Sequence, residues 1–363
     1  MLGRLLQNER WRSAMMLVLS ILMALIVGAL FMLAGDYNPI EVYWMMAQGG
    51  FVGVENILNT LQRATPLIFT GLAVLAAFQT GMFNIGVEGQ LYIGAITATW
   101  LGFALTGLPP VIHPIVALVG GMLAGAAYAL IPGVLKVKLQ VNEIITTIMT
   151  NTTALLLTGY LVNYPLRESP MAPRTPFVLK SAELPQLVPY SQVNVGVFIA
   201  LAFVFLFWFL LARTTLGYRM RMVGTAAPFA EFGGINVART AIIGMLISGA
   251  VAGLAGGIEI LGVHRRFIEQ FSIGLGFDGI LVAWLGKGSP VGVLLAALFY
   301  GGLKNGAMTV DLLTDMPREL ANTILAIVIF FLAAEGLFEF LWKRKKAKKA
   351  QKVEVKLDAA RTA

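Results

Sequence analysis

The chain has 363 residues, of which 58% are hydrophobic and 13% are charged, and its net charge is +8. Soluble domains carry about 25% charged residues, so this composition excludes a soluble protein with an ordinary charged surface. It predicts an all-α polytopic membrane protein. The absence of cysteine excludes disulfides and thiolate metal sites, and the two histidines, His113 and His264, are too few for a His-rich metal site.

Apolar runs of about 20 residues, the length that crosses a bilayer as a helix, recur along the chain. The first run is longer than the core of a signal peptide, so we interpret it as a transmembrane helix. The clear runs cover residues 14–34, 64–80, 88–106, 111–135, 142–163, 193–212, 240–262 and 320–342. A further stretch, residues 278–310, is broken by glycines and forms either two short spans or one re-entrant hairpin. We expect about ten transmembrane helices, the eighth short or re-entrant.

Positively charged loops indicate the cytoplasmic side of the membrane. If the spans alternate, the basic loops all fall on one side, and both termini are cytoplasmic. Residues 1–13 then form an N-terminal segment, 14–342 a single transmembrane domain and 343–363 a basic tail. Residues 164–192 form an external loop, and 213–239 a cytoplasmic loop. The lysine-rich start of the tail is typical of contact with anionic membrane lipid, so we expect no nucleic acid.

A polar, glycine-containing segment, residues 83–94, lies between two apolar runs with almost no hydrophilic loop. Asn84, Glu88 and Gln90 are too polar for a surface that faces lipid. The pattern predicts a discontinuous helix that lines a cavity, because unpaired backbone groups are tolerated at membrane depth only in such places. A tight cytoplasmic turn that places Glu88 near a helix N-terminus is an equally good interpretation.

A second polar group, in residues 142–151, follows one face of a helix. Spacings of three and four residues place Glu143, Thr147 and Asn151 on that face. We interpret this stripe as a wall of a solute pathway, and hydrogen bonding between helices is the alternative. A second possible role of Glu143 is to cap the helix.

The third polar group lies in residues 276–290. Asp278 begins an apolar run, where it either caps a helix or contacts a solute. Trp284 faces either the pathway or the lipid interface. The glycine-rich residues 286–289 lack the Lys directly followed by Ser or Thr of a phosphate-binding loop, so we do not expect this chain to hydrolyse ATP.

The predicted cytoplasmic stretch, residues 213–239, is unusually long for a simple connection. We predict a short amphipathic helix over residues 228–232, ended by Gly233 and Gly234. Such a loop suits the docking of a cytoplasmic partner. The alternative is a helix that lies on the lipid surface.

Together these segments resemble permease subunits of ATP-binding-cassette (ABC) importers of the nucleoside and simple-sugar type, related to ribose and branched-chain amino-acid permeases. Residues 83–94 (FNIGVEGQLYIG) and 142–151 (NEIITTIMTN) resemble the hallmarks of the nucleoside-type branch. Residues 224–257 resemble the loop that couples to the ATPase and the Gly-rich helix after it. Residues 276–292 (GFDGILVAWLGKGSPVG) resemble a further family block. The likeness covers residues 60–335.

The resemblance implies a permease subunit in a bacterial cytoplasmic (inner) membrane, not an enzyme, with nucleosides as the first choice of solute. A simple sugar or a branched-chain amino acid is the alternative. Implied partners are a second, often non-identical permease, cytoplasmic ATPase subunits that bind the ATP, and an external solute-binding protein. No cofactor bound by this chain is implied. An ion-coupled secondary transporter with Glu88 as its buried acid is a less favoured reading, and a membrane enzyme still less so.

The polar groups and the resemblance together give the candidate residues. The solute pathway is assigned to Asn84, Glu88, Gln90, Tyr92, Asn142, Thr147, Asn151, Asp278 and Trp284. The ATPase-coupling loop is assigned to Gly217, Arg221, Gly224, Pro228, Phe229, Glu231, Phe232, Gly233 and Asn236. No catalytic or metal-binding residue is assigned.

Overall fold

The computed structural model describes residues 9–169, 172–272 and 274–333. The predicted basic tail and the last part of the predicted span 320–342 lie outside the described residues, as does most of the predicted N-terminal segment. Within the described ranges the chain is helical, and its only strand-like pairings are three isolated bridges, for example between Arg174 and Ile268. The all-α prediction is therefore confirmed for the part of the chain described.

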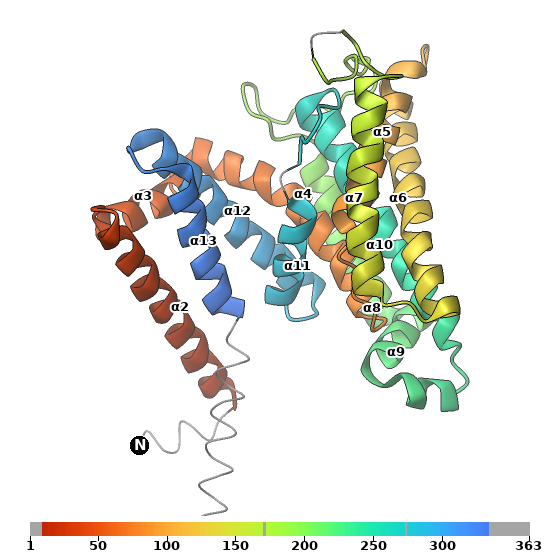
Figure 1. The fold of residues 1–363 in the computed structure, drawn as a ribbon, viewed down its shortest axis with the longest axis horizontal. Coiled ribbons are helices and arrows are strands. Elements are labelled where there is room, and N and C mark those ends of the chain that lie inside the picture. Colours follow the sequence, from red (N-terminus) through yellow and green to blue (C-terminus); the bar gives the residue numbers. More distant parts are fainter. Residues whose placement is uncertain (1–8, 170–171, 273, 334–363) are drawn as a thin grey trace, which may run out of the picture. The chain divides into compact units, whose positions relative to one another are not determined.

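Twelve α-helices and one π-helical turn follow one another along the described chain (Figure 1). Their bounds are α2 (Glu9–Ala34), α3 (Pro39–Phe51), α4 (Val54–Phe78), α5 (Val87–Ala104), α6 (Ile112–Leu139), α7 (Glu143–Asn163), α8 (Gly196–Arg213), α9 (Thr215–Phe232), α10 (Val237–Glu259), η1 (Ile260–His264), α11 (Leu275–Leu285), α12 (Pro290–Leu313) and α13 (Arg318–Ala333). The helices divide into two compact units. One comprises the residues up to Met46 and from Ala307 onward, and the other comprises Ala47–Gly306.

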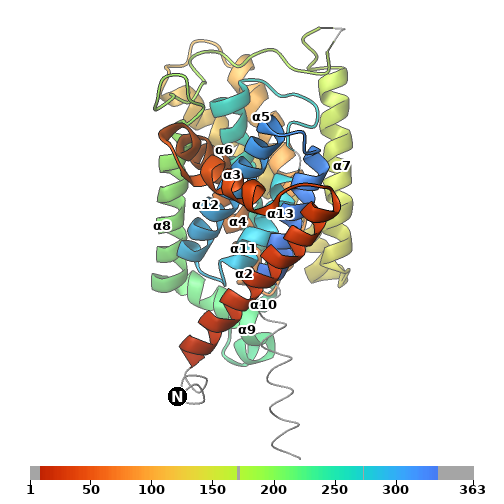
Figure 2. The ribbon, with the colours of Figure 1, turned by 90° about the vertical axis from the view of Figure 1, so that its left-hand side faces the viewer.

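The first unit is built on α2 and α13, which pack against each other (Figure 2). Its core buries residues such as Met32, Val42, Val310 and Ile324. The Tyr43 hydroxyl donates a hydrogen bond to a backbone carbonyl of α2 at 2.9 Å. This bond satisfies a polar group next to the apolar core, where an unpaired one would be costly.

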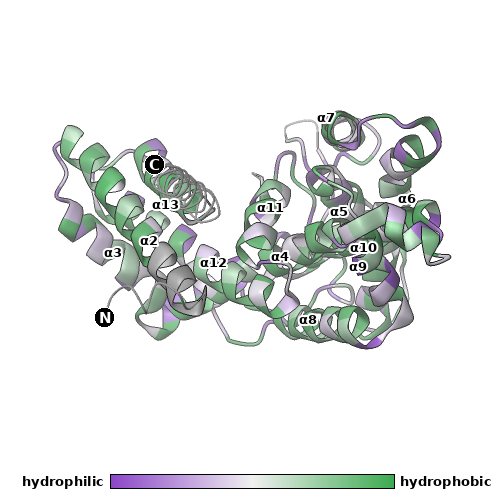
Figure 3. Ribbon diagram, turned by 90° about the horizontal axis from the view of Figure 1, so that it is seen from below, coloured by the Kyte–Doolittle hydropathy of each residue, from purple (hydrophilic) through white to green (hydrophobic). Residues whose placement is uncertain are grey.

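The second unit is arranged around α10, which contacts α4, α5 and α6. Hydrophobic residues predominate along its helices (Figure 3). The backbones approach closely where glycines meet. A Cβ built on Gly94 would lie 2.2 Å from the Gly253 Cα, and one built on Gly253 would lie 2.2 Å from the Gly121 carbonyl oxygen. Contact between α5, α6 and α10 therefore depends on small residues, as in helix packing within lipid.

Six of the described helices are long and apolar enough to cross a membrane: α4, α6, α7, α8, α10 continued by η1, and α12. A seventh span results if α2 and α3, which meet at an angle of 118°, count as one. The predicted run 88–106 corresponds to the buried helix α5. The polar residues of α5 make it less apolar than these six helices. The ten crossings and the cytoplasmic position of the termini stay predictions.

The stretch 278–310 consists of a short helix and a long one. α11 has 11 residues, which makes it about 16 Å long, roughly half of the hydrocarbon thickness of a bilayer. α12 has 24 residues. The apolar runs did not predict α3, and the predicted span that follows begins at residue 64, although α4 starts at Val54. The first turns of α4 carry Glu55, Asn56 and Asn59, which hid the helix from an apolar-run criterion.

Most of the predicted cytoplasmic loop 213–239 is helical, which corrects the prediction of a helix confined to residues 228–232. α9 begins after Thr214, whose hydroxyl accepts a hydrogen bond from the Gly217 nitrogen at 3.1 Å. It breaks at Ala226, where φ is −154° and ψ is 79°. Pro228, which lacks a backbone N–H, follows the break and explains it. The predicted end at Gly233 and Gly234 is confirmed.

We predict that Gly253→Val destabilises the second unit, because the added carbons meet the Gly121 carbonyl. Overpacking of this kind costs about 1–3 kcal/mol. The measurement is the midpoint of thermal unfolding of the purified chain in detergent. Gly233→Ala is the matched control, since the nearest atom to its added Cβ lies 3.4 Å away. Equal midpoints for both variants would contradict the close approach of the helices.

Candidate functional site

The break between α4 and α5 is held by Asn84, which is fully buried. Its Nδ2 donates to Gln90 Oε1 at 2.9 Å and to Ser248 Oγ at 2.8 Å. Its Oδ1 accepts from the Gly86 nitrogen at 2.9 Å. Ser248 lies on α10, so Asn84 ties the break to the central helix of this unit.

Asn151 of α7 satisfies backbone groups that the break leaves without helical partners. Its Oδ1 accepts from the Gly89 nitrogen at 2.8 Å, and its Nδ2 donates to the Ile85 carbonyl at 2.8 Å. The first N–H groups of any helix lack partners within it, and in an apolar environment such groups must be paired. The polar stripe of α7 therefore forms hydrogen bonds to a neighbouring segment. Such bonding between helices was the alternative interpretation of the sequence.

Glu88 lies in the first turn of α5 with 2% of its surface exposed. Its Oε1 accepts from Ser272 Oγ at 2.8 Å and from the Gly274 nitrogen at 3.3 Å, and its Oε2 accepts from the Gly276 nitrogen. The carboxylate thus occupies the N-terminus of α11, where the helix dipole favours negative charge. Gly276 permits this contact, because a Cβ there would lie 2.3 Å from the Glu88 nitrogen.

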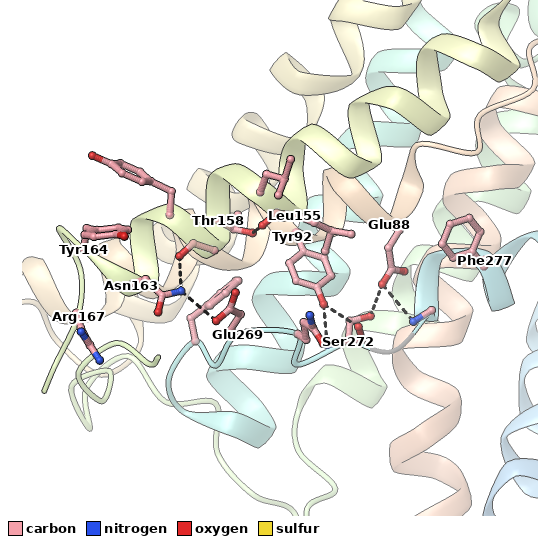
Figure 4. A pocket seen from close by; sticks show the side chains of 16 residues that line it. Glu88, Tyr92, Leu155, Thr158, Asn163, Tyr164, Arg167, Glu269, Ser272 and Phe277 are labelled. Carbon is pink, nitrogen blue, oxygen red and sulfur yellow. Dashed lines mark hydrogen bonds between the residues drawn. The ribbon is translucent and has the colours of Figure 1, made fainter. Parts of the chain in front are cut away.

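Tyr92, one turn after Glu88, binds the same segment. Its hydroxyl donates to the Ser272 carbonyl at 2.7 Å and accepts from the Ser272 nitrogen at 3.2 Å. Its ring contacts the rings of Phe267 and Phe271. Two side chains of α5 therefore fix the approach to α11, as Figure 4 shows.

Two other predicted pathway residues form hydrogen bonds within their own helix, α7. Asn142 is the N-cap of α7 and accepts from the Ile144 nitrogen at 2.9 Å. Thr147 is buried beside the break, and its hydroxyl donates to the Glu143 carbonyl at 2.6 Å. The cap is therefore Asn142, while the Glu143 side chain forms an ion pair with Lys136 at 2.8 Å.

Asp278 does not cap α11, and it is not among the residues that line the two cavities described below. The N-cap is Gly274, and Asp278 lies one turn further on. Its carboxylate accepts from the Tyr300 hydroxyl at 2.6 Å and pairs with Lys304, both on α12. Its role is thus to join α11 to α12. Trp284 is 57% exposed near the end of α11.

A cavity of about 630 Å³ lies between α5, α7 and the segment that precedes α11 (Figure 4). Glu88 and Phe277 lie toward one end, and Asn163 and Tyr164 toward the other. Apolar residues of α7 such as Leu155 line the wall between them. The mixture of aromatic, amide and carboxylate groups is typical of a site for a small polar solute.

The structure brings two of the nine predicted pathway residues, Glu88 and Tyr92, into the lining of this cavity. Sequence reasoning missed Tyr160, Asn163 and Glu269. Tyr160 and Asn163 fall at the end of an apolar run. Glu269 lies in the loop that follows η1. The Tyr160–Tyr164 spacing of four residues was the available signal.

The second part of α9, residues 227–232, is termed the outer arm. Phe229 is 66% exposed and Phe232 is 93% exposed, and Glu231 is exposed between them. Arg221 is exposed on the first part of the helix, and the buried Gly217 packs against the Leu210 carbonyl. Exposed aromatic residues on a helix that ends in a glycine turn form a surface suited to a protein partner.

The first part of α9 touches the turn that leads into the break. A Cβ on Gly224 would lie 2.6 Å from the Gln79 carbonyl oxygen. A second cavity, of about 770 Å³, is lined by Thr80, Lys136 and Glu231 among others. Asn236 closes the loop by accepting from the Arg239 nitrogen at 2.8 Å, as the N-cap of α10.

We predict that Asn151→Ala destabilises the second unit, because it leaves the Gly89 nitrogen and the Ile85 carbonyl buried without partners. The loss of one buried partner costs about 1–3 kcal/mol. The midpoint of thermal unfolding in detergent measures it. Thr153→Ala on the same helix is the control, since its exposed hydroxyl bonds only to Met149 of its own helix. An unchanged midpoint for Asn151→Ala would refute the role assigned to this side chain.

Comparison with known proteins identifies the family. A family model described as "Branched-chain amino acid transport system / permease component" matches residues 56–333. The guanosine ABC transporter permease protein NupP of Bacillus subtilis is 38% identical over 339 residues, which cover 92% of this chain and 97% of the relative.

Two further relatives matter for the interpretation. The glucose ABC transporter permease protein TsgB13 of Haloferax volcanii is 34% identical over 333 residues, 89% of this chain and 87% of its own. Bacillus subtilis also has NupQ, another guanosine ABC transporter permease protein, which is 30% identical over 289 residues, 78% of this chain and 90% of its own. No solved structure matches the chain significantly.

The resemblance that the polar segments indicated is therefore confirmed. Members of this family are transport subunits and not enzymes. The chain belongs to the branched-chain amino-acid type family of transport-system permease components and is a multi-pass membrane protein.

Proposed function

We propose that this chain is the membrane-spanning permease subunit of an ATP-driven nucleoside importer in a bacterial cytoplasmic membrane. The observation that carries the proposal is the 38% identity to the guanosine permease protein NupP over nearly the whole of both chains. About ten crossings with cytoplasmic termini, within a single transmembrane permease domain at 14–342, belong to this proposal, because ten alternating crossings place both termini and all of the basic loops on one side.

The proposed assembly contains a second, non-identical permease, cytoplasmic ATPase subunits and an external solute-binding protein. The match of both NupP and NupQ, two guanosine permease proteins of one organism, supports a pair of different permeases. ATP is bound and hydrolysed by the ATPase subunits, and this chain needs no cofactor of its own.

The outer arm of α9 is the proposed docking surface for an ATPase subunit. Phe229 and Phe232 supply exposed apolar anchors, and Glu231 supplies a charge between them. Aromatic side chains of this kind dominate the energetics of protein interfaces. Gly233 and the break before Pro228 set the direction of the arm. Movement of the ATPase subunits would turn α9, and the close contact of Gly224 with the turn at Gln79 would pass this movement to the break.

The pathway residues divide into two roles in this proposal. Asn84, Gln90 and Asn151 hold the break between α4 and α5, and solute meets them only when the bundle opens. Glu88 and Tyr92 already line the cavity. They are the proposed points at which the break senses the solute, because both also bind Ser272.

Import of a simple sugar is the second candidate function. The specific observation in its favour is the 34% identity to the glucose permease protein TsgB13 over most of both chains. Ribose, glucose and nucleosides all present hydroxyl groups, so the choice among them depends on whether the site also accommodates a base.

We predict that Phe232→Ala lowers uptake by about tenfold or more, since truncation of a central aromatic anchor costs about 2 kcal/mol or more of binding. Uptake of radiolabelled guanosine, uridine, glucose and leucine is measured in a strain that lacks the gene and is complemented with wild type or variant. Tyr218→Ala is the control, because Tyr218 is an exposed aromatic residue on the same helix before the break.

Several results would count against the proposal. If wild type restores uptake of glucose and of no nucleoside, the sugar alternative replaces it. If uptake stops when an ionophore is added while ATP remains, ATP does not drive the transport. Equal uptake by Phe232→Ala and wild type would remove the outer arm from the docking surface.

A further inference from the structure

We propose that the cavity between α5 and α7 is the seat of the nucleoside within this chain. In this seat Tyr160 and Tyr164 hold the base, and Asn163 and Glu269 bind the ribose hydroxyls. The assignment rests on the proposed function and goes further, because it names the residues that recognise each half of the solute. We term these four residues the outer end of the cavity.

The size of the cavity fits such a solute. Its volume of about 630 Å³ lies within the range of about 300–1,000 Å³ that is typical of small-molecule sites. The wall formed by α7 includes Leu155 and Leu156, which are apolar. A nucleoside combines an apolar ring face with a cluster of hydroxyls, and this cavity offers both kinds of surface along its length.

The aromatic part of the outer end comes from two tyrosines one turn apart on α7. Their ring centroids are 5.0 Å apart with an angle of 33° between the planes. Tyr160 is 58% exposed and Tyr164 is 70% exposed, and both residues line the cavity. Bases stack on aromatic side chains without regard to their hydrogen-bonding edges, with a contribution of about 1–3 kcal/mol for each base.

The polar part of the outer end presents hydrogen-bond acceptors. Asn163 Nδ2 donates to Glu269 Oε2 at 3.0 Å and to the Gly159 carbonyl at 2.9 Å. Both bonds use the nitrogen of Asn163. Among the described residues, neither Oδ1 of Asn163 nor Oε1 of Glu269 receives a hydrogen bond. Neighbouring ribose hydroxyls are donors that match two such acceptors.

A glycine makes room for the carboxylate. A Cβ built on Gly159 would lie 3.0 Å from Glu269 Oε1, closer than most real contacts of this type. Only glycine therefore lets the carboxylate rest against α7 without displacement. The backbone supports the same position, because the Glu269 nitrogen donates to the Pro173 carbonyl at 3.1 Å.

Hydrogen bonds join the lining residues at the opposite end of the cavity. Ser272 is held from both sides by Glu88 and Tyr92. A solute bound at the outer end would therefore lie at the far end of the cavity from Glu88 and Tyr92, which are tied to Ser272 in this conformation. Recognition takes place before the break between α4 and α5 has to move.

The first test uses the absence of cysteine from the chain, since an introduced thiol is then the only one it carries. Leu156→Cys places the thiol in the cavity lining, and Leu157→Cys places it next to that position but outside the lining. The chain is assembled with its partner subunits in proteoliposomes, and maleimide labelling is followed with and without guanosine. Guanosine at about ten times its half-saturating concentration leaves about a tenth of the sites empty, so labelling of Cys at 156 should slow about tenfold. Labelling at 157 should not change.

The second test compares uptake of guanosine and of 2′,3′-dideoxyguanosine, which lacks both ribose hydroxyls of the pair. Glu269→Ala and Asn163→Ala should raise KM for guanosine about tenfold or more, while KM for the dideoxy compound should change little, because a site built to bind hydroxyls discriminates through them. Tyr160→Ala should raise KM for both compounds, and Tyr160→Phe should retain the wild-type value. Gly159→Ala should reproduce part of the Glu269→Ala effect.

Each outcome decides between the two proposals. If wild type imports guanosine but labelling and both KM values are unaffected, the seat is wrong and the importer stands. If wild type imports no nucleoside, both proposals fall. If Tyr160→Ala lowers only the amount of protein in the membrane, the tyrosines are interfacial anchors of the kind that flank membrane spans, and the seat is refuted.

Discussion

Two hydrogen bonds from the side chain of Asn151 allow a helix to be interrupted inside an apolar bundle. A break between α4 and α5 releases backbone groups that lipid cannot satisfy, and each one left unpaired would cost several kcal/mol (about 2–7). Asn151 pairs with one donor and one acceptor of the break, and Asn84 accepts from the Gly86 nitrogen while its Nδ2 donates to Gln90 and to Ser248 of α10. The arrangement of polar side chains around it follows from this requirement.

The break is also the place where the two proposed functional surfaces meet. On one side, Gly224 of α9 lies directly against the turn at Gln79. On the other side, Glu88 and Tyr92 hold Ser272 and the N-terminus of α11. A continuous set of contacts therefore joins the exposed outer arm of α9 to the floor of the cavity. Packed contacts with two alternative arrangements are the physical means by which movement at one site reaches another.

The sequence predicted the polar chemistry of the site better than its geometry. The cost of polar groups in an apolar run marked Asn84, Glu88 and Gln90 in one segment and Asn151 in another. Asn84, Gln90 and Asn151 bond at the break, whereas the Glu88 side chain binds the N-terminus of α11. The extent of α9 was missed because a proline and several glycines suggested a loop. The contact between Asn163 and Glu269 was beyond prediction, since the two residues are 106 positions apart and lie on separate elements, the end of α7 and the loop that follows η1.

In the proposed mechanism, the bonds of Glu88 transmit movement from the break to the cavity. The test is Glu88→Gln, which keeps the shape of the side chain but turns an NH₂ group toward a backbone N–H that needs an acceptor. ATP hydrolysis and guanosine uptake are measured in the same proteoliposomes, with all of the partner subunits present. We expect hydrolysis to continue while uptake falls by about tenfold, the equivalent of about 1.4 kcal/mol lost from the coupled step. Uptake and hydrolysis that both match wild type would contradict it.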